Sequence, residues 1–232
     1  MMTKKIVHLL LLIALFSFAA CDDIDNYEEP KETLQGKLID ESTGNPLITE
    51  QPNGFRIKLA EISWSDTPQN EHFAGKADGT FFNKRIFKGT YEVTPVEGAF
   101  FPVEKKTVEI NGVTTVDFSV IPYLSISKPE IKKIDGTSVE VTYTLSRMKE
   151  GDKILDTRVF VSTNPNVGNN IFTSNLSPII NLKEINDTEV LQTTFKQVVT
   201  GLESGKTYYL RVGARTDNPQ KRYNFTQTIE LK

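Results

Sequence analysis

The stretch "KKTVEINGVTTVDFSVIP", residues 105–122, decides the fold class. Apolar residues occupy alternate positions on both sides of Asn111-Gly112, including Val108 and Ile110 before it and Phe118 after it. A period of two is typical of half-buried strands. Asn-Gly is a strong two-residue hairpin signal, because both central residues of that turn need positive φ. We therefore predict a β-hairpin here.

The same alternation recurs along the chain, and helical periodicity is almost absent after residue 30. Short alternating runs separated by turn residues indicate sandwiches or barrels. We therefore predict an all-β protein with two β-sandwich domains in tandem. The alternating runs include residues 55–62 ("FRIKLAEI"), 89–96 ("GTYEVTPV"), 137–145 ("TSVEVTYTL") and 206–215 ("KTYYLRVGAR").

The domain boundary is expected within "IPYLSISKP", residues 121–129, where one series of strands ends and another begins after Pro129. This places the first sandwich at 32–121 and the second at 122–232. Because the join is short, we expect the two sandwiches to pack in a fixed relation.

The N-terminal residues have the pattern of a secretory signal peptide, predicted at 1–20. Lys4 and Lys5 precede an apolar run over 6–18, and Ala19-Ala20 supply small residues for cleavage. The run is too short for a transmembrane helix, which needs about 20 residues. Cys21, the only cysteine, follows directly and could otherwise be a buried or reactive thiol.

This junction resembles the bacterial lipobox, although Phe18 stands where leucine is usual. The resemblance implies that Cys21 is lipidated and anchors the chain in the outer membrane, facing the cell surface. Residues 21–31 form an acidic tether. That stretch resembles a surface-export signal of Bacteroidota lipoproteins, and it would serve equally as a solvated spacer.

Composition argues against nucleic-acid binding and against internal disulfides. The chain has 27 Lys and Arg against 30 Asp and Glu, and no basic block, so we expect no nucleic-acid partner. With a single cysteine there is no internal disulfide, and apolar burial must hold the fold together.

The first unit resembles the carboxypeptidase-regulatory-like, transthyretin-like sandwich of secreted bacterial proteins. The pattern combines a strand, an acidic turn and later D-G-x-F and G-x-Y-x-V motifs, and its glycines and aspartates are turn formers. The matching residues are Gly36, Asp40, Thr43-Gly44, Pro46-Leu47, Asp78-Gly79, Phe81, Gly89, Tyr91 and Val93.

The second unit resembles a fibronectin type III or immunoglobulin-like sandwich. Leu202, Gly205 and Tyr208 have the spacing of a tyrosine corner, in which the tyrosine is buried and its hydroxyl bonds to the upstream backbone. Tyr209 should then point outward.

Taken together, the chain resembles the domain-of-unknown-function family numbered 3823, lipoproteins of Bacteroidota. The resemblance implies a role beside a TonB-dependent transporter and a glycan-binding lipoprotein that together take up polysaccharide. It implies no molecular activity.

No motif indicates catalysis, a metal or a cofactor. The acidic residues fall in turn contexts without the paired spacing of a glycosidase, and His72 is the one histidine after the leader. Asp66, Glu71 and Asp78 could gather around calcium, but no EF-hand-type loop is present. We expect a protein that is not an enzyme and needs no cofactor.

Exposed aromatic residues carry the one hint of ligand binding. Trp64 lies at the start of a polar loop, and we single it out with Asp66, Gln69 and Asn70 as a polysaccharide-binding candidate. Phe100-Phe101 and Tyr223 are weaker candidates, and ordinary packing is the alternative for each.

Three functions stay open on the sequence alone. The first is a non-catalytic surface lipoprotein that binds polysaccharide or supports the uptake complex. The second is a structural or adhesive module that binds protein by strand addition at a sheet edge. The third is an unusual hydrolase with a carboxylate pair in a deep cleft.

Overall fold

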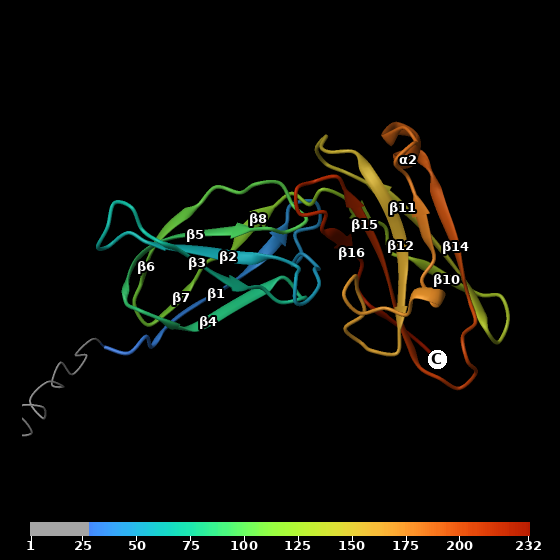
Figure 1. Cartoon of the computed structure of the whole chain (residues 1–232), viewed down its shortest axis with the longest axis horizontal. Coiled ribbons are helices and arrows are strands. Elements are labelled where there is room, and N and C mark those ends of the chain that lie inside the picture. The colour runs from blue at the N-terminus through green and yellow to red at the C-terminus, as the bar shows by residue number, and fades with distance from the viewer. Residues whose placement is uncertain (1–27) are drawn as a thin grey trace, which may run out of the picture. The chain divides into compact units, whose positions relative to one another are not determined.

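The computed structural model describes residues 28–232, so the predicted signal peptide and Cys21 lie outside the described residues. Lys31–Lys232 form one compact unit, built almost entirely of strands (Figure 1). The helical segments in the described part are η1, Ser174–Leu176, and α2, Asp187–Gln192. Neither these nor any other described segment is a helix long and apolar enough to cross a membrane. The prediction of an all-β chain with two sandwiches is confirmed.

The first sandwich contains two sheets from strands β1 to β8. One sheet has the order β3-β2-β5-β6, and in the other β1 lies between β4 and β7 and also pairs with β8. The first sheet comprises β2 (Arg56–Glu61), β3 (Asn70–Ala74), β5 (Gly89–Val96) and β6 (Lys106–Ile110), and the second β1 (Glu32–Asp40), β4 (Thr80–Ile86), β7 (Val113–Thr115) and β8 (Phe118–Val120).

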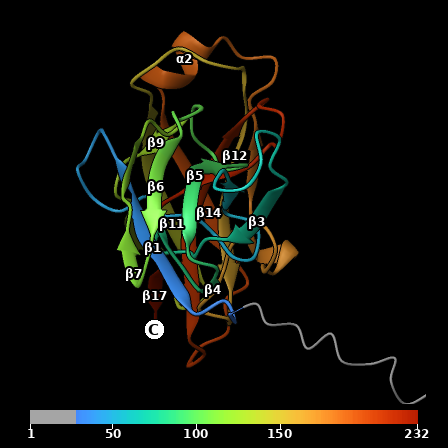
Figure 2. The ribbon, with the colours of Figure 1, turned by 90° about the vertical axis from the view of Figure 1, so that its left-hand side faces the viewer.

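The hairpin predicted across Asn111-Gly112 is wrong. β6 pairs with β5, whereas β7 and β8 pair in parallel with β1 in the other sheet. Figure 2 shows β1 and β7 next to each other. A type I′ hairpin turn needs positive φ at both central residues, but only Gly112 has it, at 75°. The turn therefore carries the chain from one sheet to the other.

The second sandwich contains strands β9 to β17. In one sheet β11 lies between β10 and β14 and also pairs with β9, and the other has the order β13-β12-β15-β16 with β17 on β15. The bounds are β9 (Ser125–Ile126), β10 (Glu130–Lys133), β11 (Ser138–Ser146), β12 (Ile154–Ser162), β13 (Ile179–Asn181), β14 (Thr194–Thr200), β15 (Tyr208–Thr216), β16 (Tyr223–Phe225) and β17 (Ile229–Leu231).

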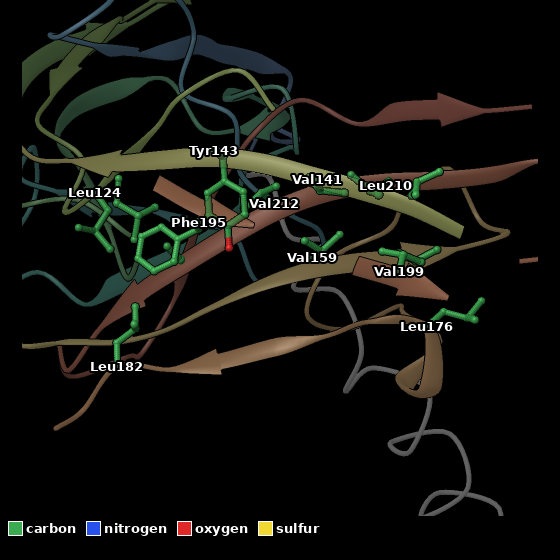
Figure 3. Packing of buried hydrophobic residues seen from close by; sticks show 14 of the residues in the cluster. Leu124, Val141, Tyr143, Val159, Leu176, Leu182, Phe195, Val199, Leu210 and Val212 are labelled. Atoms are coloured by element: carbon green, nitrogen blue, oxygen red, sulfur yellow. The ribbon is translucent and has the colours of Figure 1, made fainter. Parts of the chain in front are cut away.

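Each sandwich has its own apolar core between its sheets. Tyr143 and Phe195 lie next to each other in the second core (Figure 3). Their rings stack, with centroids 5.5 Å apart. The Tyr143 hydroxyl lies 2.9 Å from Thr157 Oγ1 and also contacts Gln197, so a buried polar group is satisfied inside the core.

Tyr208 is buried in the same core, and its hydroxyl accepts a hydrogen bond of 3.2 Å from the Glu203 backbone N–H. This is the geometry of a tyrosine corner. Tyr209, expected to point outward, is half-buried. It packs against a separate small cluster that includes Phe160 and Phe225.

Buried polar contacts link the two sandwiches within the compact unit. Arg211 donates from Nη2 to the Thr49 carbonyl at 2.9 Å, and the Glu50 carboxylate accepts from the Asn169 N–H at 2.9 Å. The Asn224 side chain donates to the Ala99 carbonyl at 2.7 Å. The short join is thus reinforced by contacts far apart in the sequence.

Candidate functional site

A groove of about 600 Å³ opens where four strands of the first sandwich end or begin. β2 ends at Glu61 and β4 at Ile86, while β3 begins at Asn70 and β5 at Gly89. The loop over residues 62–69 connects β2 to β3 and forms one wall. We call this cavity the Trp64 groove.

The floor of the Trp64 groove is set by strand register. Glu61 pairs with Tyr91 on β5, and Leu59 pairs with Glu71 on β3. Directly opposed residues project from the same face of a sheet, as do residues two apart on one strand. All four side chains therefore lie on the inward face of the sheet. At this end of the sandwich the apolar core is followed by the polar residues of the groove.

The rim carries two exposed aromatic rings. Trp64 is 85% exposed and Phe87 is 48% exposed. Large aromatic side chains bury most of their surface in ordinary packing, so Trp64 offers an uncommonly bare ring. It is also the only tryptophan in the chain.

Carboxylates lie inside the groove, and one of them is unsatisfied. Glu61 Oε1 is buried and has no hydrogen-bond partner among the described residues. Gly89 leaves room for this oxygen, because a Cβ at that position would lie 2.8 Å from it. A buried acceptor without a donor is costly. Glu61 as a whole is half-buried and lines the groove, so the residue can still accept a hydrogen bond from a bound molecule.

The pKa of Tyr91 reflects the negative charge of the groove. Its hydroxyl donates to the Phe87 carbonyl at 3.0 Å. Burial first, and then the negative charges of Glu61 and Glu71, raise the pKa of Tyr91 to about 12. The carboxylates of Glu61 and Glu71 therefore both affect the Tyr91 hydroxyl in the groove.

The structure separates the four predicted binding residues. Trp64 and Gln69 line the groove together with Ser65 and Thr67. Asp66 is exposed in the same loop and does not line the groove. Asn70 is the first residue of β3 and pairs with Ala60. Of the four, only Trp64 and Gln69 contribute to one surface.

The sequence reasoning missed Glu61, Arg85 and Phe87, and it considered Glu71 only as a calcium ligand. One signal could have found Glu61. In "FRIKLAEI" it follows Phe55, Ile57 and Leu59 at the next inward position, where a charged residue is unusual. Arg85 and Phe87 come from the end of β4, which belongs to the other sheet, so the packing of the two sheets brings them to the groove.

The other aromatic candidates are packed against neighbouring side chains of the protein. Phe100 is buried, and Phe101 makes an edge contact with Tyr123 at 4.9 Å. Tyr223 is also buried and donates to Asp156 Oδ1 at 2.5 Å. None of these rings offers a free face comparable to that of Trp64.

The suggested calcium ligands do not form a cluster. Within residues 28–232 no group of three His, Cys, Asp or Glu side chains is arranged to hold a metal ion. Asp78 instead accepts hydrogen bonds from the Thr80 N–H at 3.0 Å and hydroxyl at 2.7 Å, which fixes a turn. These bonds lower the pKa of Asp78.

Two family models match the chain. The model described as "Protein of unknown function (DUF3823) N-terminal domain" matches residues 32–121, and "Domain of unknown function (DUF3823_C)" matches residues 124–230. A comparison with curated proteins gives no match.

Solved structures support the same relationship. A DUF3823 family protein from Bacteroides uniformis is 26% identical, with a TM-score of 0.75, over 87% of this chain and 99% of the other. A second protein from the same organism, described as a "putative carbohydrate binding protein", is 25% identical, with a TM-score of 0.72, over 88% and 99%. A DUF3823 family protein from Parabacteroides merdae shares the fold at 19% identity and a TM-score of 0.70, over 88% and 100%.

Proposed function

The chain belongs to the DUF3823 family, and from this membership we propose that it is a non-catalytic surface lipoprotein that binds polysaccharide for uptake. The observation that carries the proposal is the Trp64 groove. The groove is lined by a bare indole ring, by the carboxylates of Glu61 and Glu71, and by polar loop side chains. The relative described as a carbohydrate binding protein supports the same function.

The physical basis is stacking combined with hydrogen bonding. A sugar ring has an apolar face that packs on Trp64, while Glu61 and Gln69 bond its hydroxyl groups. A shallow groove desolvates few hydroxyls, so each contact is weak. Binding to a repeating polymer raises the avidity without a new type of contact.

The proposed location rests on the lipobox resemblance, and the proposed partners rest on the family resemblance. Lipidation at Cys21 would hold the protein in the outer membrane, since two or more acyl chains give stable attachment. There it would supply polysaccharide to a TonB-dependent transporter and its glycan-binding lipoprotein. Palmitate labelling that persists in Cys21→Ser would contradict this anchor.

Strand addition has weaker support. Among the described strands β14 pairs only with β11, which leaves a seven-residue edge. Lys196 stands at an exposed position within it, and charged residues on an edge oppose pairing with another chain. Among the other edge strands, β3 carries Glu71 and His72.

The test is affinity electrophoresis of residues 22–232 against neutral, amino and acidic polysaccharides. We expect one or more polymers to retard the protein, and Trp64→Ala to weaken that retardation at least about fivefold, taking a stacked sugar ring to contribute about 1–3 kcal/mol, as a base stacked on an aromatic ring does. Phe82→Ala is the matched control, because Phe82 is 47% exposed on the same sandwich but outside the groove.

Two outcomes would contradict the proposal. Absence of retardation across the panel would favour the protein-binding alternative. Release of reducing ends from any retained polysaccharide would show that the protein is a hydrolase.

A further inference from the structure

The carboxylates of the Trp64 groove restrict which sugars can enter it. We infer that the groove selects sugars that present hydroxyl or amino donors and rejects acidic sugars, with Glu61 as the residue that sets this preference. The inference deepens the proposed function and rests on it.

Glu61 requires a hydrogen-bond donor. An ionised carboxylate can only accept hydrogen bonds, and Glu61 Oε1 is buried with no partner among the described residues. Glu61 as a whole is half-buried and lines the groove, so a hydroxyl or an ammonium group of a sugar can approach its side chain, and a charged donor is held more strongly. A uronic acid that turned its own carboxylate toward Glu61 would oppose two negative charges.

The remaining groups of the groove offset this charge only in part. Glu71 lies on the same face, and neither it nor Glu61 forms a salt bridge within the described part of the chain. The Tyr91 hydroxyl already donates to Phe87. Arg85 is the one cation lining the groove, with Lys88 nearby in sequence, and Asp66 adds a further negative charge in the loop.

Trp64 provides a direct measure of this field. Because it is the only tryptophan, the intrinsic tryptophan fluorescence of the protein comes from the groove. Quenching by caesium, iodide and neutral acrylamide at constant ionic strength compares the local concentrations of a cation, an anion and a neutral molecule. We expect caesium, scaled to acrylamide, to quench more effectively than iodide.

Charge removal should diminish the difference between caesium and iodide quenching in a graded way. Glu61→Gln should narrow the difference between caesium and iodide, and Glu61→Gln with Glu71→Gln should abolish it. Glu109→Gln is the control, because Glu109 is an exposed carboxylate on β6 of the same sandwich. Iodide quenching equal to or stronger than caesium quenching in the unmodified protein would overturn the inference.

The same fluorescence distinguishes sugars that differ in one substituent. The methyl glycosides of glucose, glucosamine and glucuronic acid are titrated at about pH 6, where the amine is charged. We expect glucuronate to bind roughly two- to fivefold more weakly than glucose, the size expected for an exposed charge interaction, and glucosamine to bind at least as well as glucose. Glu61→Gln should remove the discrimination.

The two proposals fail in different ways. Binding of glucuronate equal to or tighter than glucose overturns the charge preference while sugar binding stands. A groove that attracts caesium but responds to none of the sugars or panel polysaccharides overturns the proposed function, and the preference falls with it.

Discussion

Tyr208 shows how a single side chain fixes a corner of the second sandwich. Its ring is buried among strands of both sheets, and its hydroxyl bonds the backbone of a loop five residues upstream. Gly205, with φ of 80°, allows the chain to turn between the two. The spacing of Leu202, Gly205 and Tyr208 was enough to locate this residue, because the interaction is local in sequence.

Removal of the Tyr208 hydroxyl should lower the free energy of unfolding by about 1 kcal/mol, because the Glu203 N–H loses its acceptor. Tyr208→Ala should cost about 3–5 kcal/mol as a core truncation. Urea unfolding of Tyr208→Phe and Tyr208→Ala measures both, with Tyr209→Phe as control. A cost within about 0.5 kcal/mol for Tyr208→Ala, as at a surface site, would show that the corner is not structural.

The candidate site was only partly predictable at the scale of residues. Trp64 stood out because serine, aspartate, proline and glutamine surround it in one loop. Glu71 is brought to the groove by the pairing of β2 with β3. Register between strands depends on long-range packing, which the alternation within one strand does not specify.

At the scale of elements, the connection between β6 and β7 is the feature that the sequence pattern predicted wrongly. Its alternation predicted two strands and a turn, and those elements exist. The partners differ from the prediction because β1, about 80 residues away, offers a parallel edge that receives β7 and β8. The N–H of Gly112 also donates to the Glu32 carboxylate, which ties the turn to β1.

Gly112→Ala should destabilise the protein by about 1 kcal/mol. The cost is conformational, because Gly112 has φ of 75° and an added Cβ would meet no atom within 4 Å. Gly112→Asn should cost less, since asparagine tolerates the left-handed region. Gly136→Ala is the matched control, because its site is equally open and its φ lies outside that region. Equal stability of the Gly112 and Gly136 variants in thermal unfolding would contradict this account.

At the scale of the whole molecule, the contacts between the sandwiches place charged groups out of water. Arg211 is 4% exposed, bonds the Thr49 carbonyl and lies over the Phe225 ring at 3.9 Å. Glu50 is 5% exposed, and Arg211 attracts it. Burial of an ion is costly even when it is paired, so this junction should respond to pH.

The direction of the pKa shift of Glu50 determines how the stability of the junction changes with pH. Burial raises its pKa above the ordinary 4.5, against the opposing effects of the Asn169 N–H and Arg211. The folded state therefore favours the protonated form. Its contribution to stability is complete below about pH 4.5 and is lost as the pH rises through the folded pKa. Glu50→Gln resembles the protonated form and should lack this loss.

The measurement is urea unfolding of the unmodified protein and Glu50→Gln from about pH 4 to 7 at fixed ionic strength. Titrations at distant sites cancel in the difference between the two. We expect the unmodified protein to lose stability relative to Glu50→Gln as the pH rises. The opposite trend would mean that attraction to Arg211 and the Asn169 hydrogen bond outweigh burial, so that the junction is held by an ion pair rather than by a neutral acid.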